Sequence, residues 1–172
     1  MKIDLSQLTC RACNDENIDE ILDLQDRVIA SLPDKSLLRK NTEEMFGECV
    51  TAPNYSVGVW HEKTLVGIGI LYFAKDETED LSHLLIGVEN STVKSANYKL
   101  CMVDKNYRGN GLQVRLGKML EDRAKECGVK LLCSTVSPDN EYSRNNMLKL
   151  GYTINSRHEK YGSVRDLFYK FI

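Results

Sequence analysis

The sequence predicts one α/β domain over residues 1–172, built on a sheet of mixed topology. Its composition, with 42% hydrophobic and 28% charged residues, is typical of a soluble globular protein, and 172 residues suffice for one hydrophobic core. Apolar residues recur with helical spacing in some segments and alternate with polar residues in others. No repeat and no linker rich in Pro or Gly divides the chain. Helices and strands are therefore expected to share a single domain.

The first half of the chain is predicted to begin with a strand over residues 8–13. Asn14 and Asp15 then cap a helix whose apolar stripe continues to Leu32, and a second short helix covers 42–49. After Pro53 the period changes, which predicts strands at 55–59 and 65–73 joined by a turn at 61–63.

Residues 76–95 have weak periodicity and are predicted to form a loop with one short helix, and a loop of this length is often functional. The remaining elements are expected to be a strand at 98–103, a helix at 111–127 that Gly128 ends, a strand at 130–136, a helix at 140–150 that Gly151 ends, and two strands around Gly162 within 152–172.

Charge and hydropathy exclude several classes of partner. Lys and Arg total 23 against 25 Asp and Glu, so the basic surface that nucleic acid requires is missing. The longest nearly apolar stretch, 65–74, is much shorter than the roughly 20 residues of a membrane span. An acid, Asp4, stands where a signal peptide has its apolar run. We therefore expect a cytoplasmic protein that binds neither nucleic acid nor membrane.

The six cysteines are scattered, and in a reducing compartment we expect free thiols. Cys10 and Cys13 have the spacing of half a zinc site, but no second pair completes it. Because they fall in an expected strand, residues three apart point to opposite faces of the sheet. The sequence therefore predicts no metal site.

The segment that carries chemistry runs from Val103 to Gln113 and joins an expected strand to an expected helix. Its glycines, Gly109 and Gly111, allow a sharp turn, and the unpaired amides of a helix start suit a phosphate or pyrophosphate. The alternative to a phosphate-binding loop is a glycine turn that only connects the strand to the helix. A Walker loop and a dinucleotide fingerprint both fit poorly, because Met119 and Val114 stand where those motifs need a hydroxyl residue and a third glycine.

The run Arg108-Gly109-Asn110-Gly111-Leu112-Gln113 resembles the Arg/Gln-x-x-Gly-x-Gly/Ala signature of the GNAT superfamily of N-acetyltransferases. Residues 140–152, which begin at Asn140 and end at Gly151-Tyr152, resemble the Asn-x-x-Ala-x-x-x-Tyr-x-Lys-x-Gly-Phe block of the same superfamily. The resemblance implies a mixed, mostly antiparallel central sheet flanked by helices. It also implies acetyl-coenzyme A as co-substrate and direct acetyl transfer to a primary amine of a small molecule or peptide.

The resemblance also implies roles for particular residues. A backbone N–H of Met102 or Val103 would bind the thioester carbonyl, and the amides of the glycine loop would bind the pyrophosphate. Arg108 either contacts a phosphate or packs its stem over the strand end, and Asn140 either bonds the pantetheine arm or caps its helix. The implied cofactor-binding residues are Met102, Val103, Arg108, Gly109, Asn110, Gly111, Leu112, Gln113, Asn140 and Ser143.

Two positions depart from the superfamily pattern. Gln113 replaces the last small residue of the signature, so its side chain is expected to point away from the cofactor. Met147 replaces the Tyr that serves many relatives as general acid. Tyr142 and Tyr161 are the candidate acids in its place, whereas Tyr152 is expected to pack in the core.

The general base is not assigned, and Glu89, Asp104 and water remain open. Cys101 is expected to be a buried thiol rather than a nucleophile, since no His is near it in sequence. Because Met147 cannot donate a proton, a non-catalytic acyl-coenzyme A sensor or partner-binding module is the alternative to an enzyme.

The amine side of the cleft is expected to form from residues 18–49, from 76–95 and from the strand pair around Gly162. The second segment has four acids that either attract a cationic amine or are merely solvated: Asp76, Glu77, Glu79 and Asp80. A monomer and a homodimer both remain open. Gly117, in the middle of its helix, is expected to tolerate Ala.

Overall fold

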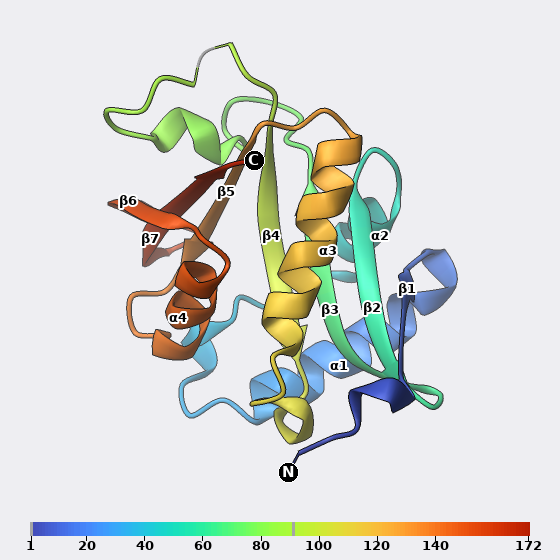
Figure 1. Cartoon of the computed structure of the whole chain (residues 1–172). Coiled ribbons are helices and arrows are strands. Elements are labelled where there is room, and N and C mark those ends of the chain that lie inside the picture. Colours follow the sequence, from blue (N-terminus) through green and yellow to red (C-terminus); the bar gives the residue numbers. More distant parts are fainter. Residues whose placement is uncertain (1, 91) are drawn as a thin grey trace.

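A seven-stranded sheet runs through the centre of the protein, with the strand order β1-β2-β3-β4-β5-β7-β6 (Figure 1). The computed structural model describes residues 2–90 and 92–172. Neighbouring strands are antiparallel except for β4 and β5, which are parallel. The predicted mixed, mostly antiparallel sheet is thus confirmed. The strands are β1 (Leu8–Ala12), β2 (Tyr55–His61), β3 (Thr64–Tyr72), β4 (Ser95–Val103), β5 (Leu131–Val136), β6 (Thr153–Lys160) and β7 (Ser163–Phe171).

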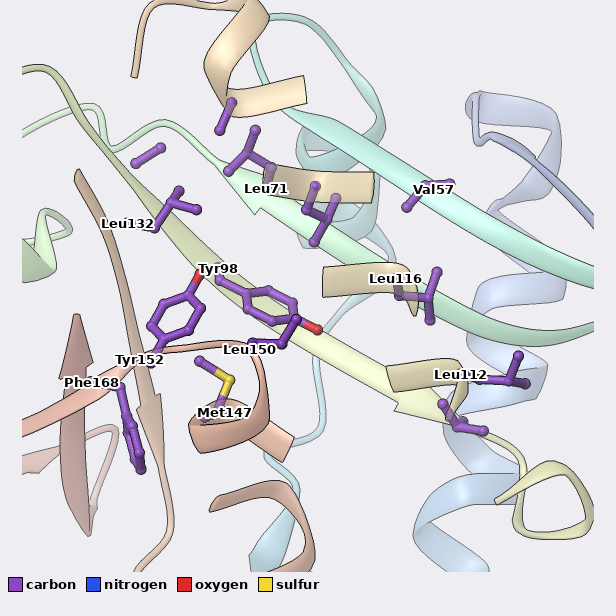
Figure 2. Close-up of a cluster of buried hydrophobic side chains, with 14 of the residues drawn as sticks. Val57, Leu71, Tyr98, Leu112, Leu116, Leu132, Met147, Leu150, Tyr152 and Phe168 are labelled. Atoms are coloured by element: carbon purple, nitrogen blue, oxygen red, sulfur yellow. The ribbon is translucent and has the colours of Figure 1, made fainter. Parts of the chain in front are cut away.

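Helices cover both faces of this sheet (Figure 1). One pair lies behind it in the view of Figure 1 and encloses a core that includes Ile21, Phe46 and Ile68. The other pair lies in front and encloses a second core that includes Leu116 and Phe168 (Figure 2). The first pair is α1 (Ile18–Ala30) and α2 (Glu43–Val50), and the second pair is α3 (Leu112–Glu126) and α4 (Glu141–Lys149).

The helix boundaries follow from caps that are visible in the sequence. Asn14 caps the 3-10 turn that leads into α1, and the Thr42 side chain accepts a hydrogen bond from the Met45 amide at the start of α2. Gly128 follows α3 with a φ of 74°, a backbone conformation that glycine adopts without strain. The segment expected to hold one short helix contains the 3-10 helix Leu81–Leu84. Residue 91 of that segment lies outside the described residues.

The tolerance expected at Gly117 is wrong. A Cβ built there would lie 2.5 Å from Cδ1 of Leu150, which is buried where α3 packs against the end of α4. The glycine is required because α3 approaches this side chain closely. Tight packing therefore outweighs the gain in helix propensity that Ala brings.

Cys10 and Cys13 lie on opposite faces of the sheet, as predicted. Cys10 packs against the core beneath α3, and Cys13 is buried in the core beneath α1 and α2. Within the described residues, no group of three His, Cys, Asp or Glu side chains is placed to hold a metal ion. No helix in the same part of the chain has both the length and the hydropathy needed to cross a membrane.

The sheet opens between β4 and β5. The two strands pair only where Ser95–Asn97 face Leu131–Cys133. A register shift against β3 then leaves Lys99 as an extra residue on β4, and such a bulge bends its strand. Just past the paired region, Ser134 Oγ donates a hydrogen bond to the Tyr98 carbonyl at 2.8 Å. Beyond this bond, no strand among the described residues pairs with this edge of β4.

Candidate active site

A cavity of about 570 Å³ lies beside the open edge of β4. This volume is within the range of small-molecule sites, and most of the lining is apolar. The C-terminal end of α1 and the chain after it form one wall, and the starts of α3 and α4 form the other. The lining residues are Val28, Leu32, Pro33, Leu37, Leu38, Cys101, Met102, Val103, Arg108, Gln113, Asp139, Asn140, Glu141, Tyr142 and Ser143.

The glycine loop joins β4 to α3 next to this cavity. Gly109 and Gly111 have φ values of 80° and 73°, and a Cβ at either position would meet open space. Gly111 is the N-cap of α3 and has no side chain to bond the first amides of the helix. Asn110 braces the loop, because its side chain donates to the Tyr107 carbonyl and accepts from the Ile3 amide, both at 3.1 Å. The start of α3 therefore offers helix-terminal N–H groups, and the loop leaves room for an anion.

Arg108 is held by neighbouring protein groups. Its Nε donates to the Val103 carbonyl at 3.1 Å, and its Nη2 donates to Ser31 Oγ at 3.0 Å. Of the two roles expected for Arg108, these contacts match packing over the strand end. The side chain ties the glycine loop to β4 and to the C-terminal end of α1.

The register of β3 and β4 decides which strand amide faces the open edge. The Asp104 amide donates to the Val66 carbonyl of β3 at 2.9 Å. Because hydrogen-bonding directions alternate along an antiparallel strand, Met102 also faces β3, while Cys101 and Val103 face away from it. The bond from Arg108 to the Val103 carbonyl agrees with this direction. Of the two amides expected to bind the ligand, only that of Val103 faces the open edge of β4.

A polar network joins the start of α3 to α4. Asn140 caps α4, since its Oδ1 accepts from the Ser143 amide at 3.0 Å. The buried Gln113 donates to Ser143 Oγ at 3.2 Å and accepts from Asn146 Nδ2 at 2.9 Å. The Gln113 side chain is therefore fixed towards α4. Its amide group connects the two helices that border the cavity.

The tyrosines that the sequence proposed as acids lie at different places. Tyr142 is exposed beside the glycine loop, where its hydroxyl accepts a hydrogen bond from the Gly109 amide at 3.4 Å. Tyr161 lies in the turn between β6 and β7, and the Arg39 guanidinium lies 4.8 Å from the centre of its ring. The structure does not bring the two hydroxyls together. Tyr152 is buried, as expected.

Neither carboxylate considered as a base lines the cavity. Asp104 is buried, forms an ion pair with Arg27, and accepts a hydrogen bond from the Asn106 amide at 2.9 Å. Glu89 is exposed in the chain after the 3-10 helix Leu81–Leu84. Cys101 lines the cavity, but burial raises the pKa of its thiol to about 12. A neutral thiol at pH 7 matches the non-nucleophilic role expected for it.

Tyr98 is a site residue that the sequence did not reveal. Among the described residues, its hydroxyl is the one buried side-chain polar atom with no hydrogen-bond partner. Burial, and next the neighbouring Cys101 thiol, raise the pKa of Tyr98 well above its usual value. An aromatic residue on a strand normally indicates core packing, so only the unpaired hydroxyl marks this one as unusual.

The Tyr98 side chain lines a smaller cavity of about 70 Å³ that borders the first one. The two cavities share Cys101, Gln113, Asn140 and Ser143 among their lining residues. Met147 of α4 also lines the smaller cavity, and Figure 2 shows it close to Tyr98 in the same cluster. Tyr98 and the residue that replaces the expected Tyr thus line the same cavity.

With a sheet that opens at β4 and a glycine loop at the start of α3, the protein has the fold of the GNAT acetyltransferases. The model of the acetyltransferase (GNAT) family matches residues 18–152, and the chain belongs to this family. Enzymes of this family use acetyl-coenzyme A. No curated protein is significantly similar to this chain in sequence.

Solved structures with the same fold agree with this assignment. A GNAT-family acetyltransferase from Streptococcus pneumoniae is 17% identical, with a TM-score of 0.72 over 96% of this chain and 99% of its own. The ribosomal-protein-S18-alanine N-acetyltransferase of Escherichia coli is 15% identical, with a TM-score of 0.71 over 96% and 94%. A Salmonella typhimurium protein solved with its cofactor acetyl-coenzyme A is 13% identical, with a TM-score of 0.69 over 96% and 93%.

Proposed function

We propose that this protein transfers an acetyl group from acetyl-coenzyme A directly to a primary amine of a small molecule or a peptide. The observation that carries the proposal is the meeting of three features at one cavity. These features are the unpaired amides at the start of α3, the open edge of β4, and an apolar cavity of about 570 Å³. Acetyl-coenzyme A supplies the acetyl group as a thioester.

The glycine loop is the proposed binding site for the pyrophosphate. The protein has a formal charge of −2, so affinity for an anion must come from local donors rather than from the overall field. The amides from Gly111 to Gln113 and the positive end of the α3 dipole are such donors. The Val103 N–H, which faces the open edge of β4, polarises the thioester carbonyl and stabilises negative charge on its oxygen.

We assign hydrogen-bond donation to the departing thiolate to the Tyr98 hydroxyl. Within the described residues this hydroxyl has no hydrogen-bond partner apart from a weak interaction with the Cys101 thiol, and Tyr98 is one of the residues that line the smaller cavity. A donor without a partner can bond the sulfur as the C–S bond breaks, without first breaking another bond. Its raised pKa keeps the proton on Tyr98 at neutral pH, which maintains the donor. The proton that completes the thiol comes from the amine and travels through water.

A non-catalytic acyl-coenzyme A sensor remains the second candidate function. Met147 favours it, because a thioether cannot replace the proton donor that many relatives have at this position. Tyr98 favours the enzyme, because it places a donor in the same small cavity. The six cysteines are all free thiols, which agrees with the proposed cytoplasmic location.

Two measurements test the proposed function. Calorimetry with acetyl-coenzyme A and with coenzyme A is expected to show binding at micromolar concentrations. Release of free thiol from acetyl-coenzyme A is then followed with a panel of amines, and turnover above the uncatalysed rate is expected for at least one of them. Binding without turnover of any amine would support the sensor, and absence of binding would contradict both functions.

A further inference from the structure

The end of the site opposite the glycine loop is lined by cations. A cavity of about 60 Å³ lies beyond the one that Tyr98 lines, and the two share Leu37, Leu38, Tyr98, Lys99, Leu100, Thr135 and Arg165. The lining on this side is completed by Arg39, Asn41, Leu81, Asn97 and Tyr161. Three cationic side chains therefore line the far end of a connected series of cavities that begins at the proposed cofactor site.

Arg165 is fixed with its charge towards this cavity. Its Nε donates to Thr135 Oγ1 at 3.1 Å, and its Nη2 donates to the Thr135 carbonyl at 3.0 Å. Both acceptors are uncharged, and within the described residues no carboxylate pairs with Arg165. Burial, and then the nearby Arg39, lower the pKa of Arg165, although Tyr161 opposes this effect. The site thus holds a partly desolvated guanidinium without a counter-charge in contact with it.

Lys99 is the bulge residue of β4, and its Nζ lies 4.1 Å from the centre of the Tyr72 ring. Burial lowers the pKa of Lys99, and Arg39 lowers it further, while Cys49 and nearby acids oppose the shift. The Arg39 guanidinium lies over the Tyr161 ring. Lys99 and Arg39 therefore contact aromatic faces, and among the described residues neither forms an ion pair.

The carboxylates near these cations are already engaged. Glu79 accepts hydrogen bonds from the Tyr72 hydroxyl at 3.0 Å and from the Lys75 amide at 2.9 Å. Glu48 forms an ion pair with Lys75 at 2.8 Å. None of the acids of residues 76–80 lines the three cavities described above.

We propose that the acceptor amine also carries an anionic group, a carboxylate or a phosphate, which Arg39, Lys99 and Arg165 bind. This inference rests on the proposed function and names the class of its acceptor. Three cations that line one small cavity repel one another, and an anion between them relieves that repulsion. The planar guanidinium groups of Arg165 and Arg39 can each form paired hydrogen bonds with a carboxylate or a phosphate. The small volume favours an anionic group on a short chain.

Paired acceptors with and without an anionic group test this inference. Acetyl transfer is measured for glycine and β-alanine against glycinamide and β-alaninamide, and for O-phosphoethanolamine against ethanolamine. We expect the anionic member of at least one pair to have a kcat/KM at least about tenfold higher. The carboxylate pairs and the phosphate pair together identify which anion is bound.

A binding measurement does not depend on turnover. Calorimetry on the protein saturated with coenzyme A compares the acetylated products, N-acetylglycine against N-acetylglycinamide and N-acetyl-O-phosphoethanolamine against N-acetylethanolamine. We expect the anionic product of at least one pair to bind at least about tenfold more tightly. Lys99→Met and Arg39→Gln are expected to remove most of that preference and to leave the Kd of coenzyme A unchanged within about twofold.

Matched controls exist for both variants. Lys94→Met removes a lysine whose Nζ lies 5.3 Å from the Phe73 ring, and Arg123→Gln removes an arginine 5.3 Å from the Tyr55 ring, both outside these cavities. These variants are expected to keep the preference for anionic products. Equal binding of charged and neutral members in every pair, with coenzyme A bound, would overturn the anion site alone. A parent protein that does not bind coenzyme A would overturn the proposed function, and this inference with it.

Discussion

Tyr98 on β4 and Met147 on α4 line the same cavity, next to the place where β4 and β5 separate (Figure 2). Met147 is buried and apolar, whereas Tyr98 has a buried hydroxyl without a partner. An unpaired buried hydroxyl costs stability, and a structure without a use for it would be more stable with Phe at this position. The pair agrees with the proposed role of Tyr98 as hydrogen-bond donor to the departing thiolate, at a site where Met147 of α4 cannot donate.

Tyr98→Phe is expected to lower kcat by about 10- to 100-fold, because the departing thiolate loses its hydrogen-bond donor. The Kd of acetyl-coenzyme A is expected to stay within about twofold. The melting temperature is expected to remain the same or to rise, since the variant removes only an unpaired hydroxyl. Steady-state kinetics, calorimetry and thermal unfolding measure the three quantities.

The matched control is Tyr152→Phe. Tyr152 is buried in the same core, with its ring centre 6.4 Å from that of Tyr98, but it lines none of the three cavities. We expect its substitution to leave kcat unchanged.

A second readout does not require an acceptor. If Tyr98 donates to the sulfur, the thiol pKa of bound coenzyme A, followed by ultraviolet absorbance of the thiolate, is higher in Tyr98→Phe than in the parent. Equal thiol pKa values would contradict the assigned role.

Stability at low pH is expected to depend on Glu121. Burial disfavours its charged form, but hydrogen bonds from Lys170 at 2.6 Å and Lys125 at 3.0 Å outweigh this and hold its pKa below the usual value. A carboxyl whose pKa is lower in the folded state stabilises the fold above its unfolded pKa, here near 4.5, and this contribution is lost as pH falls through the folded value.

Glu121→Gln is therefore expected to lower the free energy of unfolding at pH 7 by about 1–2 kcal/mol and to flatten its decrease below about pH 4.5. Urea unfolding at several pH values measures both effects. Glu126→Gln is the control, since the pair of Glu126 with Arg123 is mostly exposed and contributes little. If the free energy of unfolding falls equally below about pH 4.5 in the parent and in Glu121→Gln, the prediction is contradicted.

The ion pair of Arg27 with the buried Asp104 connects α1 to the end of β4. Arg27 also donates to the Leu65 carbonyl at 2.8 Å. Arg27→Met leaves a buried carboxylate without its counter-charge and is expected to destabilise the fold by about 3–5 kcal/mol. The double variant Arg27→Met/Asp104→Asn is expected to recover part of this loss, and urea unfolding of the three variants measures it. If the loss in free energy of unfolding of the double variant equals the sum of the losses of the two single variants, the two side chains are not coupled.

The sequence predicted the order of elements because helical and alternating periods are local properties. The apolar residues Ile21, Leu24 and Val28 are buried on one side of α1, as their spacing indicates, and the glycine loop follows β4 where its motif places it. The opening between β4 and β5 was not predictable in this way, because it depends on how far two distant strands stay in register. For the same reason, the choice between Met102 and Val103 required the register with β3.

The site residues that the sequence missed are those that distant segments bring together. Tyr98 has the pattern of a core aromatic residue, and Lys99 and Arg39 have the pattern of exposed cations. Only the tertiary structure brings Tyr98 to the same cavity as Met147, and both cations to the same cavity as Arg165. The expectation at Gly117 failed for the same reason, since the close contact with Leu150 arises between α3 and the end of α4.

Gly111 and Gly128 provide a matched test of the cofactor loop. They lie at the two ends of α3, with φ values of 73° and 74°, and a Cβ at either position would meet open space in the protein. Valine at each is therefore expected to cause similar backbone strain, on the order of 1–2 kcal/mol or somewhat more for a branched side chain. Thermal unfolding is expected to show comparable losses of stability in Gly111→Val and Gly128→Val.

Binding of acetyl-coenzyme A is expected to separate these two variants. Only Gly111 lies at the helix start, where its amide and the space beside it are proposed to receive the pyrophosphate. Gly111→Val is expected to weaken binding at least about tenfold, or 1.4 kcal/mol, whereas Gly128→Val is expected to bind like the parent. Calorimetry at a temperature where both variants are folded measures the difference. Equal affinity in the two variants would place the pyrophosphate elsewhere, because strain alone acts at both ends of the helix.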